Sequence, residues 1–237
     1  MSALTVGFDL DMTLVDSRPG IAAAYRALTA RTGVPVDAEL AVSRLGPPLR
    51  TEIAHWFPPE EVESAVLVYR ELYPAYAITP TVPLPGAREA IEVIRARGGR
   101  VLVVTSKIAR LAQLHLDHLG IAVDEVAGDL FAEQKATALR QHGATHYVGD
   151  HVADMVAARA AGVPGIGVAT GPCSRDELLA AGAEVVLDDL TGFPGGARRH
   201  DPASLGAVAA QVKQGFSGAY GSSEVVRHGQ GIRLRHQ

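Results

Sequence analysis

Short apolar runs alternate along the chain with longer segments of helical pattern. The apolar runs cover residues 4–8, 100–104, 146–148, 165–168 and 184–187, and these are the expected strands. Near-continuous apolar runs are typical of strands that are buried on both faces of a sheet. The expected helices are residues 86–97, 108–119, 134–142, 153–161 and 175–181, each followed by a glycine. This alternation predicts an α/β fold with a doubly wound parallel sheet.

One long segment interrupts the alternation. Residues 16–82 have a helical pattern without a strand, and the helices expected there are 19–32, 48–56 and 59–73. The proline-rich residues 78–85 then return the chain to the sheet. Because ligands of doubly wound sheets bind beyond the carboxyl ends of the strands, we expect this insertion to cover the site. The expected organisation is a core of residues 1–15 and 83–195 with a helical insertion of residues 16–82.

The chain changes character after about residue 195. Residues 198–237 contain six Lys and Arg residues but only two acidic ones, and glycines and serines cluster at residues 215–223. Residues 204–214 have the pattern of a single helix. We therefore expect residues 196–237 to form an extension with one helix and a loose basic tail.

Composition and charge narrow the range of partners. The 237 residues are 47% hydrophobic and 20% charged, which is an ordinary globular balance. A net charge of −4 gives no reason to expect nucleic acid or an anionic membrane as partner. The single cysteine excludes an internal disulfide, and no apolar run approaches the roughly 18 residues that span a bilayer. We expect a cytoplasmic protein, monomeric or homodimeric, that binds neither nucleic acid nor membranes.

Two carboxylates follow the first expected strand, at Asp9 and Asp11, with Thr13 close behind. Side chains two residues apart in an extended chain point the same way. One carboxylate can act as a nucleophile and form an acyl phosphate, while its neighbour transfers protons. The alternative is a loop whose aspartates cap the next turn.

Two further features can bind a phosphate group. Thr105, Ser106 and Lys107 end the strand 100–104, and hydroxyl and N–H groups at such a turn can hold phosphate oxygens. Lys135 lies at the start of the helix 134–142, where a positive charge opposes the helix dipole unless an anion is bound nearby. The alternatives are a helix cap at Thr105 and Ser106 and a solvated surface lysine at residue 135.

A fourth feature follows the strand 146–148. Asp150 and Asp154 are one helical turn apart, so their side chains can share a face. Clustered carboxylates suit a hard cation such as Mg²⁺, although Asp150 could instead cap the helix. All four features fall in order at the carboxyl ends of successive strands, where α/β sheets build active sites.

Together these features resemble the four motifs of the haloacid dehalogenase superfamily. The matching positions are Asp9-x-Asp11-x-Thr13, the strand ending at Thr105, Lys135 and Asp150-x-x-x-Asp154. The insertion resembles the small helical cap of the subgroup that contains phosphoglycolate phosphatases, and the match covers about residues 3–195. Met12 stands where that subgroup usually has glycine, and Lys135 lacks the proline that often follows it. This second departure leaves Lys107 as the alternative family lysine.

The resemblance implies a Rossmann-like core and Mg²⁺-dependent hydrolysis of a small phosphate monoester. Asp9 would attack phosphorus to form an aspartyl-phosphate, and Asp11 would protonate the leaving alcohol and then activate water. Mg²⁺ would be bound by Asp9, the backbone carbonyl of Asp11 and Asp150. The phosphoryl oxygens would be held by Thr105, the N–H of Ser106 and Lys135, while Thr13 braces the Asp9 loop and Asp154 orients the metal waters or Lys135.

Several related chemistries can be weighed from the residues. Dehalogenases of this fold lack the second aspartate, so Asp11 argues against them, and phosphonate-cleaving relatives need a cap lysine, which residues 16–104 do not contain. A sugar-phosphate mutase and a non-catalytic phospho-ligand binding or regulatory module stay open as alternatives. Substrate choice is expected to lie in the cap, with Arg18, Arg44 and Arg50 as candidates for binding a substrate anion. Each of the three could equally be a surface arginine.

Overall fold

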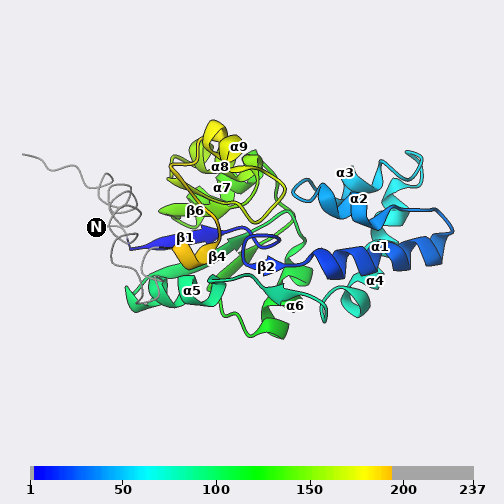
Figure 1. The fold of residues 1–237 in the computed structure, drawn as a ribbon, viewed down its shortest axis with the longest axis horizontal. Helices are drawn as coiled ribbons and strands as arrows, with labels where there is room; N and C mark the ends of the chain where they lie inside the picture. Colours follow the sequence, from blue (N-terminus) through cyan, green and yellow to red (C-terminus); the bar gives the residue numbers. More distant parts are fainter. Residues whose placement is uncertain (1–2, 194–237) are drawn as a thin grey trace, which may run out of the picture.

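The computed structural model describes residues 3–193 and contains a six-stranded parallel sheet (Figure 1). The strand order is β5 (Glu125–Ala127), β4 (Arg100–Val104), β1 (Thr5–Phe8), β6 (His146–Gly149), β7 (Gly165–Val168) and β8 (Val185–Leu187). Strand β1 pairs with β4 on one side and with β6 on the other. From β1 outward, the strands follow one another in chain order on both sides of the sheet. The predicted doubly wound parallel sheet is therefore confirmed. The extension predicted for residues 196–237 lies outside the described residues.

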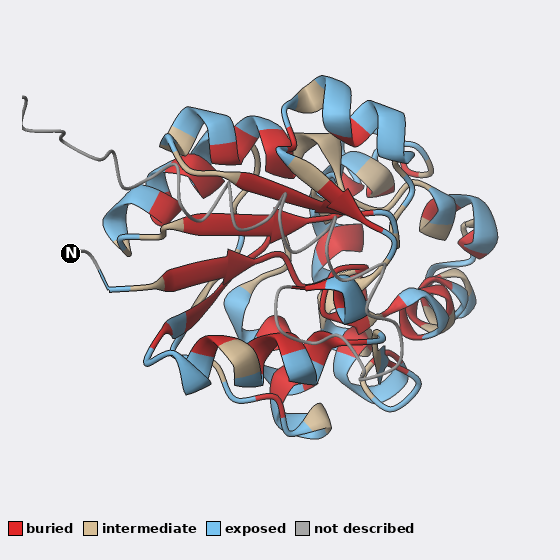
Figure 2. Ribbon diagram, turned by 60° about the vertical axis from the view of Figure 1, so that its left-hand side comes forward, coloured by how far each residue is buried: buried red, intermediate tan, exposed pale blue. Residues whose placement is uncertain are grey.

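Helices cover both faces of this sheet. One face is covered by α5 (Ala87–Ala96), α6 (Ala109–Leu119) and the 3-10 turn η1 (Leu190–Gly192). The other face is covered by α7 (Glu133–Gln141), α8 (Val152–Ala161) and α9 (Arg175–Ala181). Figure 2 shows the central strands of the sheet buried along most of their length and the flanking helices exposed on their outer sides. This two-sided burial explains why the strands are continuous apolar runs rather than alternating ones.

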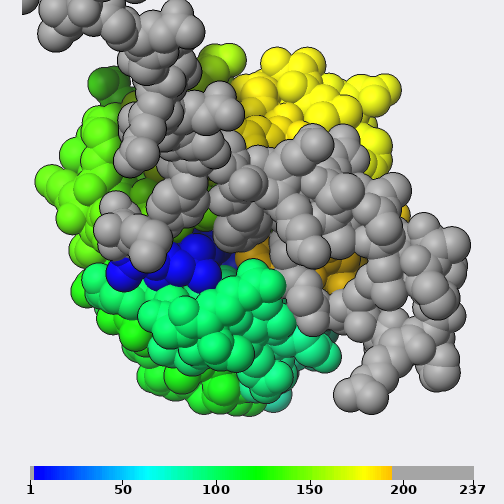
Figure 3. All heavy atoms as spheres, turned by 90° about the vertical axis from the view of Figure 1, so that its left-hand side faces the viewer, coloured from blue at the N-terminus to red at the C-terminus, as the bar shows by residue number. Residues whose placement is uncertain are grey.

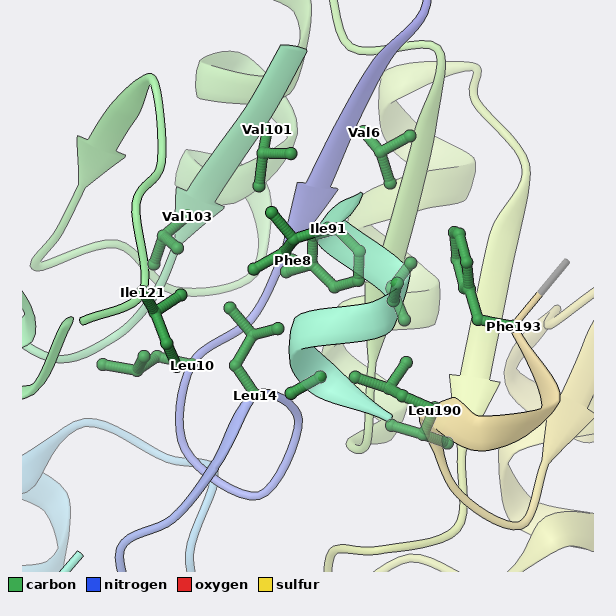
Figure 4. Packing of buried hydrophobic residues seen from close by; sticks show 14 of the residues in the cluster. Val6, Phe8, Leu10, Leu14, Ile91, Val101, Val103, Ile121, Leu190 and Phe193 are labelled. Atoms are coloured by element: carbon green, nitrogen blue, oxygen red, sulfur yellow. The ribbon is translucent and has the colours of Figure 1, made fainter. Parts of the chain in front are cut away.

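The core is densest around β1. Val6 and Phe8 pack with Val101 and Val103 of β4 against α5, as Figure 4 shows. Gly7 faces the opposite side, where a Cβ atom would lie 2.8 Å from the side chain of Leu139 in α7. The close approach of α7 to β1 is what places the start of this helix beside the end of the strand.

Besides η1 and the two-residue strands Val15–Asp16 and Val82–Pro83, which border a segment expected to lack strands, two elements were not predicted from the sequence. Strand β5 lies at the edge of the sheet and has a single neighbour. It is only three residues long and contains a glutamate. Helix α2 (Ala38–Ser43) is a six-residue helix that begins where the Asp37 side chain accepts a hydrogen bond from the N–H of Leu40. Both are too short to produce a clear periodic pattern.

The helical insertion lies between two short antiparallel strands, β2 (Val15–Asp16) and β3 (Val82–Pro83). It consists of α1 (Arg18–Thr32), α2, α3 (Leu49–Ile53) and α4 (Val62–Tyr76), which pack around a core of their own. Figure 1 shows the insertion at the end of the sheet where β1 and β4 terminate. At the opposite end, Figure 3 shows the dark-blue start of the chain beside the turquoise atoms of α5. The insertion is thus placed to cover one end of the sheet only.

None of the helices within residues 3–193 has both the length and the apolar character needed to cross a membrane.

Gly20 allows the start of α1 to lie directly against the end of α4. A Cβ atom at this position would be 2.1 Å from the carbonyl oxygen of Ala77, far inside van der Waals contact. Alanine is a better helix former than glycine by about 1 kcal/mol, but the two segments would have to separate to admit it. We expect Gly20→Ala to lower the free energy of unfolding by about 1–3 kcal/mol, as measured by urea denaturation.

The control for this variant is Ala27→Gly, at a half-buried position of the same helix. This reverse exchange measures helix propensity without a steric conflict. A Gly20→Ala protein more stable than the wild type would contradict the inference of close packing.

Candidate active site

The loop that follows β1 holds Asp9 at the end of the strand. The Asp9 N–H donates to the carbonyl of Val148 in β6 at 2.8 Å, and the residue is 8% exposed. Met12, further along the loop, has a φ of +60°, the left-handed region that favours glycine. A non-glycine residue there costs about 1–2 kcal/mol, which burial of the Met12 side chain helps to offset. The departure from the usual glycine therefore preserves the turn.

Lys135 lies between the first and fourth sequence motifs. Its Nζ atom donates to Asp9 Oδ1 at 2.9 Å and to Asp154 Oδ1 at 2.7 Å, and the residue is buried. Burial alone lowers the pKa of Lys135, but the charges of Asp154 and Asp9 outweigh it and raise the pKa well above its ordinary value. The lysine is therefore charged. Of the two lysines left open by the sequence, the structure places Lys135 on the expected nucleophile.

Asp9, Asp150 and Asp154 form a buried group of carboxylates with oxygen atoms within 4.8 Å of one another. The pKa of Asp9 is raised to about 6, mainly by burial, with Lys135 opposing the rise and the charges of Asp154 and Asp11 adding to it. Burial likewise raises the pKa of Asp150 well above its ordinary value, followed by the charges of Asp9 and Asp154. Three carboxylates beside one ammonium group leave an excess of negative charge, which a divalent cation would neutralise. The oxygen donors thus fit Mg²⁺.

Asp154 has fewer free acceptor positions than the other two carboxylates. Its Oδ1 accepts from Lys135 and from the Tyr147 hydroxyl at 3.2 Å, and its Oδ2 accepts from the N–H of His151 at 3.2 Å. Asp150 accepts one hydrogen bond, from the Thr13 hydroxyl at 2.7 Å. This distribution suits a metal ligand at Asp150 and a supporting residue at Asp154.

Gly171 is a site residue that sequence reasoning missed. A Cβ atom there would lie 1.8 Å from Oδ2 of Asp150, so only glycine fits beside this carboxylate. The glycine follows β7 in the segment 169–174, and nothing in its local sequence marks it as part of the site.

Asp11 has a separate set of partners, on the side of the cap. Its Oδ1 accepts hydrogen bonds from Ser17 Oγ at 2.5 Å and from Lys107 Nζ at 2.7 Å. Lys107 also donates to the hydroxyl of Tyr73, which in turn lies 3.0 Å from Nε2 of His115. Burial alone raises the pKa of Asp11, but the charge of Lys107 and these hydrogen bonds outweigh it and lower the pKa below its ordinary value.

The turn after β4 contacts the cap. The Thr105 hydroxyl accepts from the N–H of Lys107 at 3.3 Å, the turn-capping contact that the sequence left open. Ser106 Oγ donates to the carbonyl of Gly46 at 3.3 Å, and a Cβ atom at Gly46 would lie 2.5 Å from the His151 ring. Figure 1 shows this cap loop, between α2 and α3, reaching toward the core. The cap loop therefore lies against the core at two points.

A cavity of about 90 Å³ lies between cap and core, and both Asp9 and Asp11 line it. Ser106 and Lys107 line the cavity from the core. Its cap side carries apolar and tyrosine side chains, among them Tyr25, Leu45, Pro47, Leu49 and Tyr69. Arg70 of α4 also lines the cavity, and its Nη2 lies 3.3 Å from Oδ1 of the largely exposed Asp129. An ion pair of this length with an exposed partner is weak.

The structure does not bring the three arginines expected from the sequence to this cavity. Arg18 pairs with Asp16 at 2.7 Å, and Arg44 pairs with Glu52 at 2.6 Å. Arg50 pairs with Glu63 at 2.7 Å, with 60% of its side chain exposed. The loop between α2 and α3 places Leu45 and Leu49 at the cavity. Its two arginines pair elsewhere, Arg44 with the largely buried Glu52 beside Trp56 and Arg50 with the exposed Glu63. Arg70 was missed, since it is one of many arginines at a helical position.

Comparison with known proteins agrees with this geometry. The sequence profile of haloacid dehalogenase-like hydrolases matches residues 6–168. The chain is 30% identical over 210 residues to the probable phosphatase IndB of Dickeya dadantii, covering 80% of this chain and 91% of that protein. It is 29% identical over 215 residues to the phosphoglycolate phosphatase of Caulobacter vibrioides, covering 82% and 90% respectively.

A solved structure shares both the core and the insertion. It is a haloacid dehalogenase-like hydrolase from Streptococcus pneumoniae, with a TM-score of 0.70 and 26% sequence identity over 86% of this chain and 97% of that chain. Fold, site and relatives together define a hydrolase of the phosphatase class on a doubly wound α/β core. The chain belongs to the haloacid dehalogenase-like hydrolase family. The resemblance found in its sequence motifs is therefore confirmed.

Proposed function

We propose that this protein hydrolyses a small phosphate monoester with the help of Mg²⁺ and through an aspartyl-phosphate on Asp9. The observation that carries the proposal is the pairing of buried Asp9 with Lys135 at 2.9 Å, at a cavity that Asp11 also lines. A carboxylate held beside an ammonium group can approach a phosphate dianion with less electrostatic repulsion. The phosphatase relatives support the same chemistry.

The first half of the reaction transfers the phosphoryl group to the protein. An oxygen of Asp9 attacks phosphorus, the bond between phosphorus and the ester oxygen breaks, and Asp11 gives a proton to the leaving alcohol. Lys135, Ser106 and Thr105 hold the phosphoryl oxygens as charge moves onto them. Asp9, Asp150 and the backbone carbonyl of Asp11 would hold Mg²⁺, which would neutralise charge between the two anions.

The second half releases phosphate. Water attacks phosphorus, its proton passes to the carboxylate of Asp11, and the bond between phosphorus and Asp9 breaks. Inorganic phosphate then leaves, and both aspartates return to their initial state. Lys107 lowers the pKa of Asp11, so the proton that Asp11 donates has to be taken up when the substrate binds, because a phosphate dianion beside a carboxylate favours the protonated form of that carboxylate. Asp11 then acts first as an acid and afterwards as a base.

An assay of phosphate release tests this function against the two alternatives. The substrates are phosphoglycolate, nucleoside monophosphates, sugar phosphates and p-nitrophenyl phosphate, each with and without Mg²⁺. A phosphatase releases inorganic phosphate from at least one of them. Isomerisation of a sugar phosphate without net release identifies a mutase, and binding without turnover identifies a non-catalytic module.

We further propose that Arg70 recognises an anionic group at the non-transferred end of the substrate. Arg70 is a cavity-lining arginine of the cap, and its partner Asp129 is exposed and can be displaced. A carboxylate is such a group, and the phosphoglycolate phosphatase relative is named for a substrate that carries one. Arg70 thus takes, in this proposal, the role of binding a substrate anion that the sequence predicted for Arg50.

Two matched substrates test this assignment. Phosphoglycolate carries a carboxylate at the position where 2-hydroxyethyl phosphate carries a neutral hydroxymethyl group. We expect Arg70→Ala to lower kcat/KM for phosphoglycolate by at least about tenfold, since a hydrogen bond to a charged group contributes about 1.5–3 kcal/mol. The neutral substrate should lose much less. Arg50→Ala is the control, because its guanidinium pairs with Glu63 outside the cavity. Equal losses on both substrates would show that Arg70 only supports the cap.

A further inference from the structure

A chain of partly buried hydrogen bonds runs from the cap to Asp11, whose side chain is 18% exposed. It begins at Tyr73 in α4, whose hydroxyl accepts from Lys107 Nζ at 2.5 Å, and continues from Lys107 to Asp11 Oδ1 at 2.7 Å. Tyr73 is 2% exposed and the Lys107 side chain 8% exposed. Buried hydrogen bonds of this kind hold their members in one arrangement, because breaking one leaves a polar group without water.

The two donors to Asp11 act on the same oxygen atom. Ser17 and Lys107 both donate to Oδ1, and among residues 3–193 no hydrogen bond engages Oδ2. Since Asp11 lines the cavity with Asp9, Oδ2 is the oxygen left for a ligand. Fixing one oxygen from two directions sets the rotation of the carboxylate and therefore the direction of the other oxygen.

Lys107 is itself held in place by the cap. A lysine side chain has several rotatable bonds, so its ammonium group needs further contacts to stay in one position. Tyr73 provides two, the hydroxyl hydrogen bond and a ring whose centroid lies 4.6 Å from Nζ. His115 fixes Tyr73 in turn. Burial lowers the pKa of His115 to about 3, so its neutral ring can accept the proton of the Tyr73 hydroxyl.

We propose that Lys107 and Tyr73 are positioning residues that aim Oδ2 of Asp11 at the leaving-group oxygen, so that the cap supplies part of the proton-transfer machinery. This inference rests on the proposed role of Asp11 as acid and base. It assigns Lys107 a task different from that of Lys135, which lies on the nucleophile.

Leaving groups separate this role from a general structural one. An alkyl alcohol leaves slowly unless Asp11 protonates it, whereas p-nitrophenolate is stable as an anion and leaves without a proton. Hydrolysis of the aspartyl-phosphate needs Asp11 as a base whichever substrate formed it. A misdirected Asp11 should therefore slow the first step for alkyl phosphates and the second step for every substrate.

The test compares Lys107→Met with the wild type on 2-hydroxyethyl phosphate and p-nitrophenyl phosphate. We expect kcat/KM for the alkyl ester to fall by about 10²-fold, the lower end of what general acid catalysis contributes. For p-nitrophenyl phosphate we expect a fall of less than about threefold in kcat/KM, together with a burst of one p-nitrophenolate per active site before a slower steady state.

Tyr73→Phe provides a second variant that keeps the ring and removes only the hydroxyl. It should lower kcat/KM for 2-hydroxyethyl phosphate relative to kcat/KM for p-nitrophenyl phosphate, as Lys107→Met does. The expected change in this ratio is about five- to tenfold, in keeping with the loss of one hydrogen bond. The double variant should be no worse than Lys107→Met, because both act through one contact. Tyr76→Phe is the control, since Tyr76 is an exposed tyrosine of the same helix and is not among the residues that line the cavity. Its ratio should stay within about twofold of the wild type.

Each outcome has a distinct meaning. Equal losses on both esters without a burst, in Lys107→Met or in Tyr73→Phe, would overturn the inference and leave a structural role for these residues. An unchanged ratio in both variants would overturn it as well. A wild-type protein that releases phosphate from neither ester would instead contradict the proposed function. Should Lys107→Met fail to fold, the comparison of Tyr73→Phe with Tyr76→Phe decides between a positioning and a structural role.

Discussion

Replacing Asp9 with asparagine is expected to abolish turnover, with kcat falling by at least about 10⁴-fold. An amide is a poor nucleophile and cannot form the acyl phosphate, so the reaction loses its covalent step rather than a fraction of its transition-state stabilisation. Asparagine has nearly the same shape and keeps the oxygen that accepts from Lys135. The fold should therefore persist, with a melting temperature close to that of the wild type.

The measurement is multiple-turnover release of phosphate from the best substrate, with protein expressed and purified free of other phosphatases. Asp188→Asn is the control, because this aspartate is exposed and distant from the cavity residues, and its activity should equal that of the wild type. Activity of Asp9→Asn above about 1% of the wild type would exclude covalent catalysis by Asp9. Acid-stable trapping of a phosphorylated wild-type protein, absent from Asp9→Asn, would support it directly.

Removal of divalent metal is expected to lower activity by at least about 10³-fold, and added Mg²⁺ to restore it. The buried carboxylates Asp9, Asp150 and Asp154 carry more negative charge than Lys135 balances, so a phosphate dianion approaching without a cation meets net repulsion. The expected 10³-fold loss of activity corresponds to a loss of about 4 kcal/mol in transition-state stabilisation. Ca²⁺ should support little activity, since it takes more ligands at longer distances than Mg²⁺.

Activity in EDTA and after titration with Mg²⁺ or Ca²⁺ measures the effect. Mg²⁺ should also raise the melting temperature, because an ion bound only by the folded state stabilises that state. Asp150→Asn should lose both responses, whereas Asp129→Asn, an exposed carboxylate, should keep the rise in melting temperature. Full activity in the presence of chelator would show that Asp9, Asp150 and Asp154 do not act by binding a metal ion.

The two lysines show where sequence reasoning reaches its limit. Lys107 and Lys135 both follow strands of the same sheet, and the sequence favoured Lys135 as the family lysine but left Lys107 as the alternative. The close packing of α7 on Gly7 places Lys135 beside Asp9, whereas the turn after β4 directs Lys107 to Asp11 and Tyr73. Side-chain direction depends on how each helix packs on the sheet, and this packing is a tertiary property.

The cap shows the same limit more strongly. Its helical character followed from the sequence pattern, but the sequence did not show that Arg50 pairs with Glu63 away from the cavity, so a substrate-binding role of Arg50 stays a prediction. Arg70 lines the cavity through the packing of the cap on the core, and no local pattern records that packing. Gly171 and Tyr73 were missed for the same reason.

The sequence by itself determined the order of most strands and helices, the family and the positions of the four motifs. Strands buried on both faces have to be continuous apolar runs, which makes them visible in the sequence. The motifs follow these runs because the active site lies at the carboxyl ends of the strands. Tertiary structure decided how those motifs divide into two buried networks, one of Asp9, Lys135 and Asp154 and one of Asp11, Lys107 and Tyr73. The link from the end of β1 spans 126 positions in the first network, from Asp9 to Lys135, and 96 positions in the second, from Asp11 to Lys107. Contacts at such separations depend on packing across the sheet and across the cap, which short-range patterns do not encode.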